Sequence, residues 1–269
     1  MNSVIVIPAR FGSTRFPGKP LAQVQGIPML QRVWALAASV PEASRVVIAT
    51  DHPDIESLCR AIGAEVVRTA GVFRSGTDRV YAIISRIEPT PDVVVNFQGD
   101  AVLTPPWVVQ SVVRSFSDDN TVQMATPAVR MSPEALAKLR DQKRSGEAGG
   151  TTVVFDRMNN ALYFSKSIIP CARDPGQAVV HRHIGLYAYR AKTLGRLVAT
   201  EQGPLERQEQ LEQLRALEHG VPIRVVLVDY QGRTHWSIDS QHDLLRAERL
   251  IVDEGELLPA YDGSFRLSS

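Results

Sequence analysis

Short apolar runs alternate with stretches of helical periodicity through the first half of the chain. A run of about four to eight apolar residues is typical of a strand buried on both faces, whereas apolar residues three and four positions apart indicate one face of a helix. The runs predict strands over residues 4–7, 45–50, 64–67 and 93–96, and the stripes predict helices over 29–37, 53–62, 77–87 and 108–116. This alternation predicts a parallel sheet with helices on both sides.

The second half of the chain is less regular. Its apolar runs predict strands over residues 121–129, 151–156, 161–165, 183–189 and 223–228, with a hairpin turn at 156–160. Residues 140–150 are polar and predict a loop, whereas the stretch from Pro204 to Gly220 predicts one long helix. Residues 236–238 resemble a strand, and Ser240 with Asp243 predicts a capping box that begins the last helix.

Together these elements predict an α/β fold with three layers and a mostly parallel sheet. No repeat, low-complexity tract or Pro/Ser-rich linker divides the chain, so we expect a single domain over residues 1–252. The irregular region, about 119–233, is interpreted as a mixed-sheet insertion. Residues 253–269 lack periodicity and are interpreted as a C-terminal tail.

Composition narrows the class of protein. The chain has 269 residues and a net charge of +1, which gives no electrostatic support for a nucleic-acid partner. No apolar run is long enough to span a membrane, and the first residues lack the basic-then-apolar pattern of a leader, so we expect a cytoplasmic protein with no membrane partner. Its two cysteines exclude a disulfide framework.

The loop after the first predicted strand carries three cations, Arg10, Arg15 and Lys19, together with Gly12 and Gly18. Glycines allow the backbone to approach a ligand closely, and the fixed positive charges suit a polyphosphate. Pro20 follows Lys19, so this is not a Walker A motif, and no dinucleotide fingerprint follows the strand. An ordinary basic surface turn is the alternative interpretation.

Other polar groups follow the remaining predicted strands, where ligands bind in open parallel sheets. They are Asp51, residues 75–79, the Gln98-Gly99-Asp100 segment and Asp239. Asp100 and Asp239 are expected to meet across one crevice, where two carboxylates beside a polyphosphate would form a Mg²⁺ site. The structural alternatives are a helix N-cap for Asp51, a simple helix start for 75–79, a turn residue for Asp100 and a cap for Asp239. His181 and His183 alternate on a predicted strand and so are not expected to share a metal.

Seven segments in order resemble one enzyme family. They are residues 8–21, 49–51, 75–79, 96–100, 161–165, 182–190 and 204–215. The chain is similar over roughly residues 3–250 to the CMP-KDO synthetases, which are 3-deoxy-manno-octulosonate cytidylyltransferases. The resemblance implies a glycosyltransferase-A-like nucleotidyltransferase that depends on Mg²⁺, uses CTP, releases pyrophosphate and forms a homodimer. It divides the domain into a nucleotide part, about 1–118 and 234–252, and an acceptor and dimer part, about 119–233.

The resemblance also implies roles for individual residues. The residues implied to be catalytic are Arg10, Lys19 and Asp100, and Asp100 and Asp239 are the implied metal ligands. Nucleotide binding is implied for Pro8, Ala9, Arg10, Arg15, Lys19, Ser75, Gly76, Thr77 and Arg79. Acceptor binding is implied for Gln98, His183, Tyr187, Glu212 and Gln213.

Several positions on the acceptor side depart from the family pattern. Ala101-Val102 stands where the family has Glu-Pro, Lys166 replaces an arginine, and Cys171 replaces a tryptophan. A lysine does not reproduce the bidentate grip of an arginine on a carboxylate. The first hypothesis is therefore cytidylyl transfer to a small acidic acceptor of the 3-deoxy-2-keto sugar acid type. The alternatives are the same reaction on a phosphonate or other small anion, and a non-catalytic nucleotide-binding protein.

Overall fold

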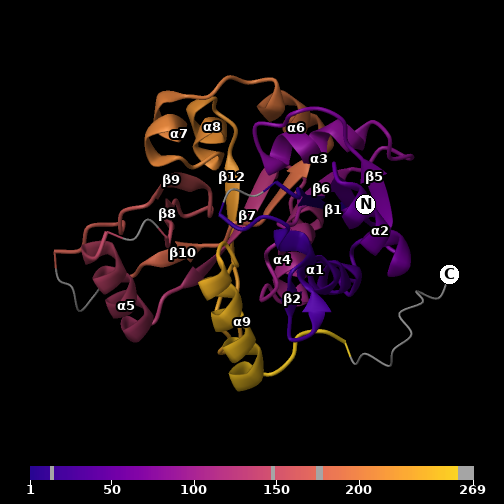
Figure 1. The fold of residues 1–269 in the computed structure, drawn as a ribbon. Coiled ribbons are helices and arrows are strands. Elements are labelled where there is room, and N and C mark those ends of the chain that lie inside the picture. The colour runs from indigo at the N-terminus through magenta and orange to yellow at the C-terminus, as the bar shows by residue number, and fades with distance from the viewer. Residues whose placement is uncertain (13–14, 147–148, 174–177, 260–269) are drawn as a thin grey trace.

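One mixed sheet of ten strands forms the centre of the molecule in the computed structural model, which describes residues 1–12, 15–146, 149–173 and 178–259 (Figure 1). Along the sheet the strands follow the order β5-β4-β1-β6-β11-β7-β10-β8-β9, and β12 pairs with β7. The strands are β1 (Ser3–Ala9), β4 (Arg45–Thr50), β5 (Glu65–Arg68), β6 (Val93–Asn96), β7 (Met124–Arg130), β8 (Thr152–Phe155), β9 (Ala161–Ser165), β10 (His181–His183), β11 (Tyr187–Arg190) and β12 (Ile223–Leu227). The short strands β2 (Gln23–Val24) and β3 (Ile27–Pro28) form a separate ribbon.

The first half of the sheet is parallel. Strand β1 pairs in parallel with β4 and β6, and β4 pairs in parallel with β5. Beyond β6 the strands β11, β7, β10, β8 and β9 pair antiparallel, and β12 returns parallel to β7. The predicted α/β fold with a parallel sheet that continues into a mixed one is therefore confirmed.

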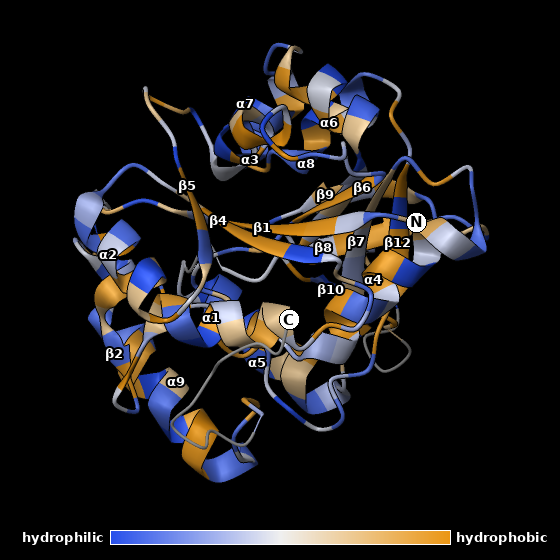
Figure 2. Ribbon diagram, turned by 90° about the vertical axis from the view of Figure 1, so that its right-hand side faces the viewer, coloured by the Kyte–Doolittle hydropathy of each residue, from blue (hydrophilic) through white to orange (hydrophobic). Residues whose placement is uncertain are grey.

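Helices cover both faces of this sheet, which makes three layers (Figure 2). One layer contains α1 (Met29–Ala38), α2 (Pro53–Ala61), α4 (Pro106–Asp118) and α9 (Gln241–Glu254). The opposite layer contains α3 (Gly76–Ile84), α6 (Ala191–Val198), α7 (Pro204–Glu209) and α8 (Gln213–Glu218). No described helix is both long and apolar enough to cross a membrane.

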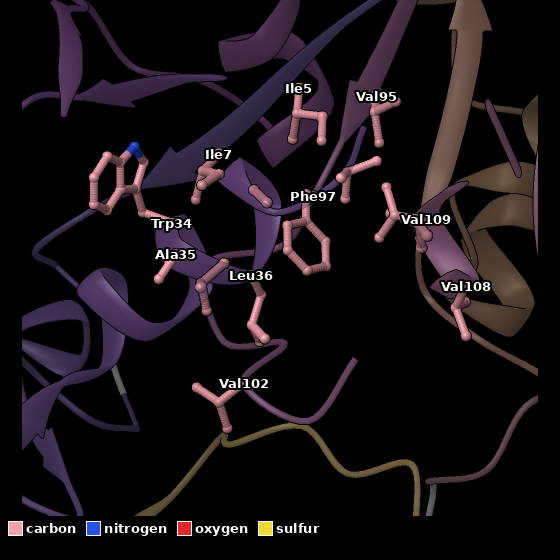
Figure 3. Close-up of a cluster of buried hydrophobic side chains, with 14 of the residues drawn as sticks. Ile5, Ile7, Trp34, Ala35, Leu36, Val95, Phe97, Val102, Val108 and Val109 are labelled. Carbon is pink, nitrogen blue, oxygen red and sulfur yellow. The ribbon is translucent and has the colours of Figure 1, made fainter. Parts of the chain in front are cut away.

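Two apolar clusters hold the helical layers to the sheet. In the first cluster, Ile5 and Phe97 from the sheet strands or their ends lie close to Leu36 of α1 and Val109 of α4 (Figure 3). Each such side chain contributes about 1.5–3 kcal/mol when it is fully buried. Because both faces of β1 and β6 are covered, their residues are apolar except for Ser3 and Asn96 at the strand ends, which is why the first half of the sequence predicts its strands well.

The predicted polar loop over 140–150 is wrong in its first part. Residues 140–144 belong to helix α5 (Pro133–Arg144), which begins where the Ser132 hydroxyl accepts a hydrogen bond from the backbone N–H of Ala135. Leu136 and Leu139 of this helix are buried. Two apolar residues are too few to give the mostly polar sequence of the segment a recognisable helical pattern. Residues 147–148 lie outside the described residues.

The single strand predicted over 183–189 is also wrong, because the structure divides it into β10 and β11. Between them the backbone N–H of Leu186 bonds to the carbonyl of Ile184 at 2.7 Å. The hydroxyl of Thr126 donates to the carbonyl of Leu186 at 2.8 Å. These bonds satisfy the backbone polar groups of Leu186 at a bend, and the apolar residues of the segment 183–189 do not indicate this bend.

The long helix predicted from Pro204 to Gly220 breaks into α7 and α8 at Gln210, whose φ is +51°. The break allows Arg215 to fold back on Glu206, with hydrogen bonds of 2.7 and 2.6 Å between two side chains that are each 5% exposed. Nine residues of continuous helix would separate these positions by about 13 Å along the axis. The ion pair therefore requires two helices.

The C-terminal region confirms the capping box, in which Ser240 and Asp243 exchange hydrogen bonds at the start of α9. Residues 236–238, predicted as strand-like, form no strand. Helix α9 continues to Glu254, and Glu256 pairs with Arg32 at 2.8 Å, so the predicted tail is anchored over its first residues. Residues 260–269 of the tail lie outside the described residues.

Candidate active site

A cleft of about 280 Å³ lies at the carboxyl end of the parallel strands. It is lined by Pro8, Ala9, Arg10, Arg15, Lys19, Pro20, Phe73, Arg74, Ser75, Gly76, Arg79, Gln98, Gly99, Asp100 and Asp239. These residues come from the ends of β1 and β6, from the start of α3 and from the segment before α9. The groups predicted at this edge of the sheet, with the exceptions given below, therefore share one cleft.

The loop after β1 is folded back so that its cations face the cleft. Gly18 has a φ of +69°, and its backbone N–H bonds to the carbonyl of Phe11 at 3.0 Å. The short 3₁₀ helix η1 (Lys19–Leu21) begins directly after this left-handed residue, and Pro20 suits its first turn. This geometry directs Lys19 inward, where its side chain is 15% exposed. Ser13 and Thr14 of the same motif lie outside the described residues.

Lys19 joins the two aspartates that the sequence places at this edge. Its Nζ donates hydrogen bonds to Asp100 Oδ2 at 2.6 Å, to the carbonyl of Ile238 at 2.8 Å and to Asp239 Oδ1 at 3.4 Å. Arg15 adds a second cation, with its Nη2 3.1 Å from Asp239 Oδ1. Asp100 and Asp239 thus contact the same ammonium group although 139 positions separate them in the chain.

Local structure explains how each aspartate reaches this point. A Cβ at Gly99 would lie 3.0 Å from the carbonyl oxygen of Pro8, so the close passage of β6 past β1 favours glycine just before Asp100. Asp239 precedes the N-cap of α9, and its backbone N–H donates to Asp243 at 3.2 Å. The capping alternative for Asp239 is therefore wrong, since Ser240 provides the cap.

The start of α3 forms another wall of the cleft. The hydroxyl of Ser75 caps the helix by accepting from the N–H of Asp78, and Gly76 packs so closely on Pro8 that a Cβ would lie 3.3 Å from its Cγ. A helix N-terminus with free N–H groups is suited to an anion. Ser75 and Gly76 line the cleft, but Thr77 does not. It lines the small cavity beside Tyr187 and Glu212, and its hydroxyl accepts a hydrogen bond from Asn96 of β6 at 3.1 Å.

Arg79 lines the cleft but is already engaged by protein groups. Its guanidinium lies 2.5 Å from Asp51, donates to Thr69 at 2.6 Å and stacks over the ring of Phe73 at 4.9 Å. The interpretation of Asp51 as a helix cap is wrong, because the ring of His52 accepts the hydrogen bond from the start of α2. Arg79 is thus held in place by Asp51.

Of the five predicted acceptor residues only Gln98 lines the cleft, and the ring of His183 lies 5.5 Å from that of Tyr187, centroid to centroid. Gln98 lines the cleft, whereas Tyr187, Glu212 and Gln213 surround a separate cavity of only about 20 Å³ that shares no lining residue with it. His183 is buried, with its Nε2 2.9 Å from the hydroxyl of Thr126. Burial lowers the pKa of His183 to about 3 and raises the pKa of Glu212, so both groups favour their neutral forms.

Sequence reasoning missed Phe73 and Arg74, which line the cleft. Their position directly before residues 75–79 could have indicated this, because residues that precede a ligand-binding helix start lie next to the same ligand. It also missed a second cavity of about 170 Å³ that shares Gln98 and Asp100 with the cleft. No local pattern marks that cavity, because its walls come from three separated segments.

Comparisons with known proteins agree with this arrangement. The sequence profile of the family described as "Cytidylyltransferase" matches residues 4–224. A 3-deoxy-manno-octulosonate cytidylyltransferase from Maricaulis maris (strain MCS10) is 51% identical over 259 residues, which cover 96% of this chain and 100% of the relative. The protein of the same description from Anaeromyxobacter sp. (strain Fw109-5) is 42% identical over 249 residues, covering 92% and 96%.

A solved structure is similar over nearly the whole fold. It is that of a CMP:2-keto-3-deoxy-manno-octonic acid synthetase complexed with CTP, which superposes with a TM-score of 0.85 at 33% identity. The alignment covers 94% of this chain and 100% of that chain.

Proposed function

The chain belongs to the cytidylyltransferase family and, within it, to the 3-deoxy-manno-octulosonate (KDO) cytidylyltransferases, and on this basis we propose the reaction that it catalyses. It transfers CMP from CTP to a small acidic acceptor of the 3-deoxy-2-keto sugar acid type and releases pyrophosphate. The names of the relatives and the CTP-bound similar structure support this substrate pair over a phosphonate acceptor or a non-catalytic role.

The observation that carries the proposal is the meeting of Lys19, Asp100 and Asp239 in a cleft that is also lined by Arg10 and Arg15. Both substrates are anions and repel each other until positive charge screens them. A cleft in which Arg10, Arg15 and Lys19 lie beside two carboxylates can bind a triphosphate and still hold a divalent metal ion. The paired carboxylates beside these cations favour catalysis over nucleotide binding alone.

The donor set fits Mg²⁺. No group of three or more His, Cys, Asp or Glu side chains suited to a metal occurs among the described residues, so protein ligands alone do not complete a site. Mg²⁺ is commonly held by one or two carboxylates together with phosphate oxygens and water, which matches Asp100 and Asp239 beside a triphosphate. When bound, the ion would neutralise phosphate charge and polarise the reacting oxygens.

The protein's own residues would then position the reactants. The acceptor hydroxyl attacks the α-phosphorus of CTP as the bond to the β-phosphate oxygen breaks, and placement and charge neutralisation supply most of the catalysis. We assign Arg10 and Lys19 to the developing charge on the pyrophosphate. We assign the start of α3 to the binding of the nucleotide. We assign Gln98 to the binding of the acceptor, because Gln98 lines both the cleft and the cavity of about 170 Å³ next to it.

Two further expectations belong to the proposal. A homodimer is supported by the β8–β9 hairpin, which lies at the edge of the sheet and exposes Met158 and Leu162 to 67% and 63%. Apolar side chains on an unpaired edge favour association with a second chain. Cytoplasmic location stays a prediction from the sequence.

The reaction is tested by measuring pyrophosphate release with CTP, Mg²⁺ and a panel of acceptors. The panel contains KDO, related keto sugar acids and small phosphonates, with ATP, GTP and UTP as nucleotide controls. We expect release with CTP and KDO. Release only with a phosphonate would replace the acceptor, and CTP binding without release for any acceptor would contradict enzymatic function.

A further inference from the structure

Asp239, one of the two proposed metal ligands, lies on a segment without β-pairing. Residues 236–238 form no strand, so no ladder of backbone hydrogen bonds fixes the chain that leads to Asp239. Its carboxylate is 43% exposed. Residues that bind a metal ion are oriented by hydrogen bonds to neighbouring groups, and these neighbours affect metal affinity. The contacts around Asp239 therefore indicate which residue prepares it for the ion.

The residue before Asp239 is fixed by packing and by two backbone contacts. The side chain of Ile238 is fully buried in the apolar cluster that also contains Ala247 of α9. Its carbonyl accepts a hydrogen bond from Lys19 at 2.8 Å, and its backbone N–H donates to the carbonyl of Asp100 at 3.5 Å. None of these contacts involves the backbone of Asp239 itself.

The backbone of Asp239 is held by Asp243, the third residue of α9. The Oδ2 atom of Asp243 accepts hydrogen bonds from the backbone N–H of Asp239 at 3.2 Å, from the backbone N–H of Ser240 at 2.9 Å and from the Ser240 hydroxyl at 2.7 Å. A capping box requires only the exchange between Ser240 and Asp243. The bond from Asp239 therefore exceeds what the start of the helix needs, and it reaches the residue that carries the proposed metal ligand.

Asp243 is itself held on both sides of this bond. Its backbone N–H donates to the hydroxyl of Ser240 at 3.2 Å, and its carbonyl accepts from the indole N–H of Trp236 at 3.2 Å. The guanidinium of Arg246 is stacked over the ring of Trp236 at 3.9 Å. The first turns of α9 thus contact the chain both before and after Asp239.

The far end of the same segment is joined to the end of α9. Thr234 donates from its backbone N–H and its hydroxyl to the carboxylate of Glu254, at 2.9 and 2.6 Å. The helix rises about 16 Å between Asp243 and Glu254, a distance that the chain from Thr234 to Asp239 can span when it is extended. The segment therefore runs antiparallel along α9, which supports it in place of a neighbouring strand.

We propose that Asp243 is a positioning residue for Mg²⁺ binding, which orients Asp239 by accepting the hydrogen bond from its backbone N–H. The inference rests on the proposed function, because it takes Asp239 as a ligand of the ion. Asp243 is not among the residues that line the cleft, so its effect on the ion is exerted through Asp239. Removal of such a partner commonly lowers metal affinity or activity by about 10- to 100-fold.

The test compares Asp243→Ala with Ser240→Ala, because both variants damage the same capping box. Only Asp243→Ala removes the bond to Asp239, since Ser240→Ala keeps the carboxylate and the backbone N–H groups of positions 239 and 240. Calorimetry of CTP binding, with Mg²⁺ and then with EDTA, gives the gain in CTP affinity that depends on the ion. We expect this gain to fall about tenfold or more in Asp243→Ala and to stay within about twofold of wild type in Ser240→Ala.

Two further measurements identify the cause. In the pyrophosphate-release assay, Asp243→Ala should raise the Mg²⁺ concentration at half-maximal rate by about tenfold or more, while KM for KDO stays within about twofold. Hydrogen exchange of the Asp239 amide, followed by NMR without metal ion, should be at least about tenfold faster in Asp243→Ala than in Ser240→Ala. Asp243→Asn keeps an oxygen that can accept from this amide, and should recover most of both losses.

The outcomes separate the inference from the function on which it rests. If wild-type enzyme releases no pyrophosphate with any acceptor, the proposed reaction alone is wrong, because the calorimetric gain is measured without an acceptor. An equal gain in wild type and Asp243→Ala would overturn the inference. Equal losses in Asp243→Ala and Ser240→Ala would also overturn it, since the helix cap alone would then account for them. Equal losses in Asp243→Ala and Asp243→Asn would assign the effect to charge and would likewise overturn it.

Discussion

Replacing Lys19 with methionine tests whether this residue blocks the metal site of the nucleotide-free enzyme. Its ammonium group contacts both Asp100 and Asp239, the two carboxylates proposed to bind Mg²⁺. A metal ion and the ammonium cannot occupy that position together. We therefore expect Lys19 to leave the aspartates only when CTP supplies phosphate oxygens for it to bind.

The magnitude follows from the bonds that must be broken. The hydrogen bond of 2.6 Å to Asp100 joins two charged and mostly buried groups, and such bonds contribute about 1.5–3 kcal/mol. The contact with Asp239 adds little, because that carboxylate is 43% exposed and solvent screens it. Since 1.4 kcal/mol equals a factor of ten, Lys19→Met should tighten metal binding without nucleotide by about 10- to 100-fold.

The assay is a titration with Mn²⁺, in which electron paramagnetic resonance reports the free ion. Lys19→Met should bind Mn²⁺ more tightly than wild type without CTP, yet should lose at least about 10²-fold in turnover because a charge at the leaving pyrophosphate is gone. Arg10→Met removes a cation of the same cleft that forms no ion pair with either aspartate among the described residues, so its Mn²⁺ affinity should change little. Equal or weaker Mn²⁺ binding by Lys19→Met would refute the reasoning.

Three other predictions address the site and the fold. Asp100→Asn should lower turnover at saturating Mg²⁺ by at least about 10²-fold, as measured by pyrophosphate release. The control Asp229→Asn, at an exposed position, should not lower turnover. Near-wild-type turnover of Asp100→Asn would contradict its assignment as a metal ligand. Arg215→Ala should lower the free energy of unfolding in urea by about 3–5 kcal/mol, because it leaves the carboxylate of Glu206 buried without its partner, and a loss below about 1 kcal/mol would show that the pair does not hold α7 to α8. Burial lowers the pKa of His183 to about 3, so between pH 6.5 and pH 3 the unfolded chain binds a proton that the folded chain does not. The stability that the neutral His183 contributes is therefore complete above pH 6.5 and should fall by about 1.4 kcal/mol per pH unit below it. Urea unfolding at pH 7.5 and 5.5 should show a smaller loss of stability for His183→Gln than for wild type.

Much of the nucleotide half could be predicted from local sequence. Strands β4 and β6 begin and end at their predicted residues, because each has a continuous apolar run that is largely buried. The cleft residues were also predictable, since parallel strands end at one edge and the polar groups that follow them gather there. Asp239 was placed correctly even though residues 236–238 form no strand, because the capping box alone sets the position of the chain before α9.

The acceptor half could not be predicted in the same way. One local pattern of leucines covers α7 and α8, and only the buried bond between Glu206 and Arg215 shows that the helix must break. Likewise, motifs group Gln98 with His183 and Glu212, but Gln98 lines the cleft, Glu212 lines the small cavity beside Tyr187, and His183 is buried.

The sequence by itself determined which segments form strands and helices and which edge of the sheet carries charge, because side-chain periodicity and capping depend on neighbours within a few residues. Only the tertiary structure decided that Lys19 bridges two distant carboxylates and that a cavity of about 170 Å³, formed by three separated segments, shares Asp100 with the cleft. Those relations depend on how separated segments pack, and packing energies are summed over contacts that no local pattern contains.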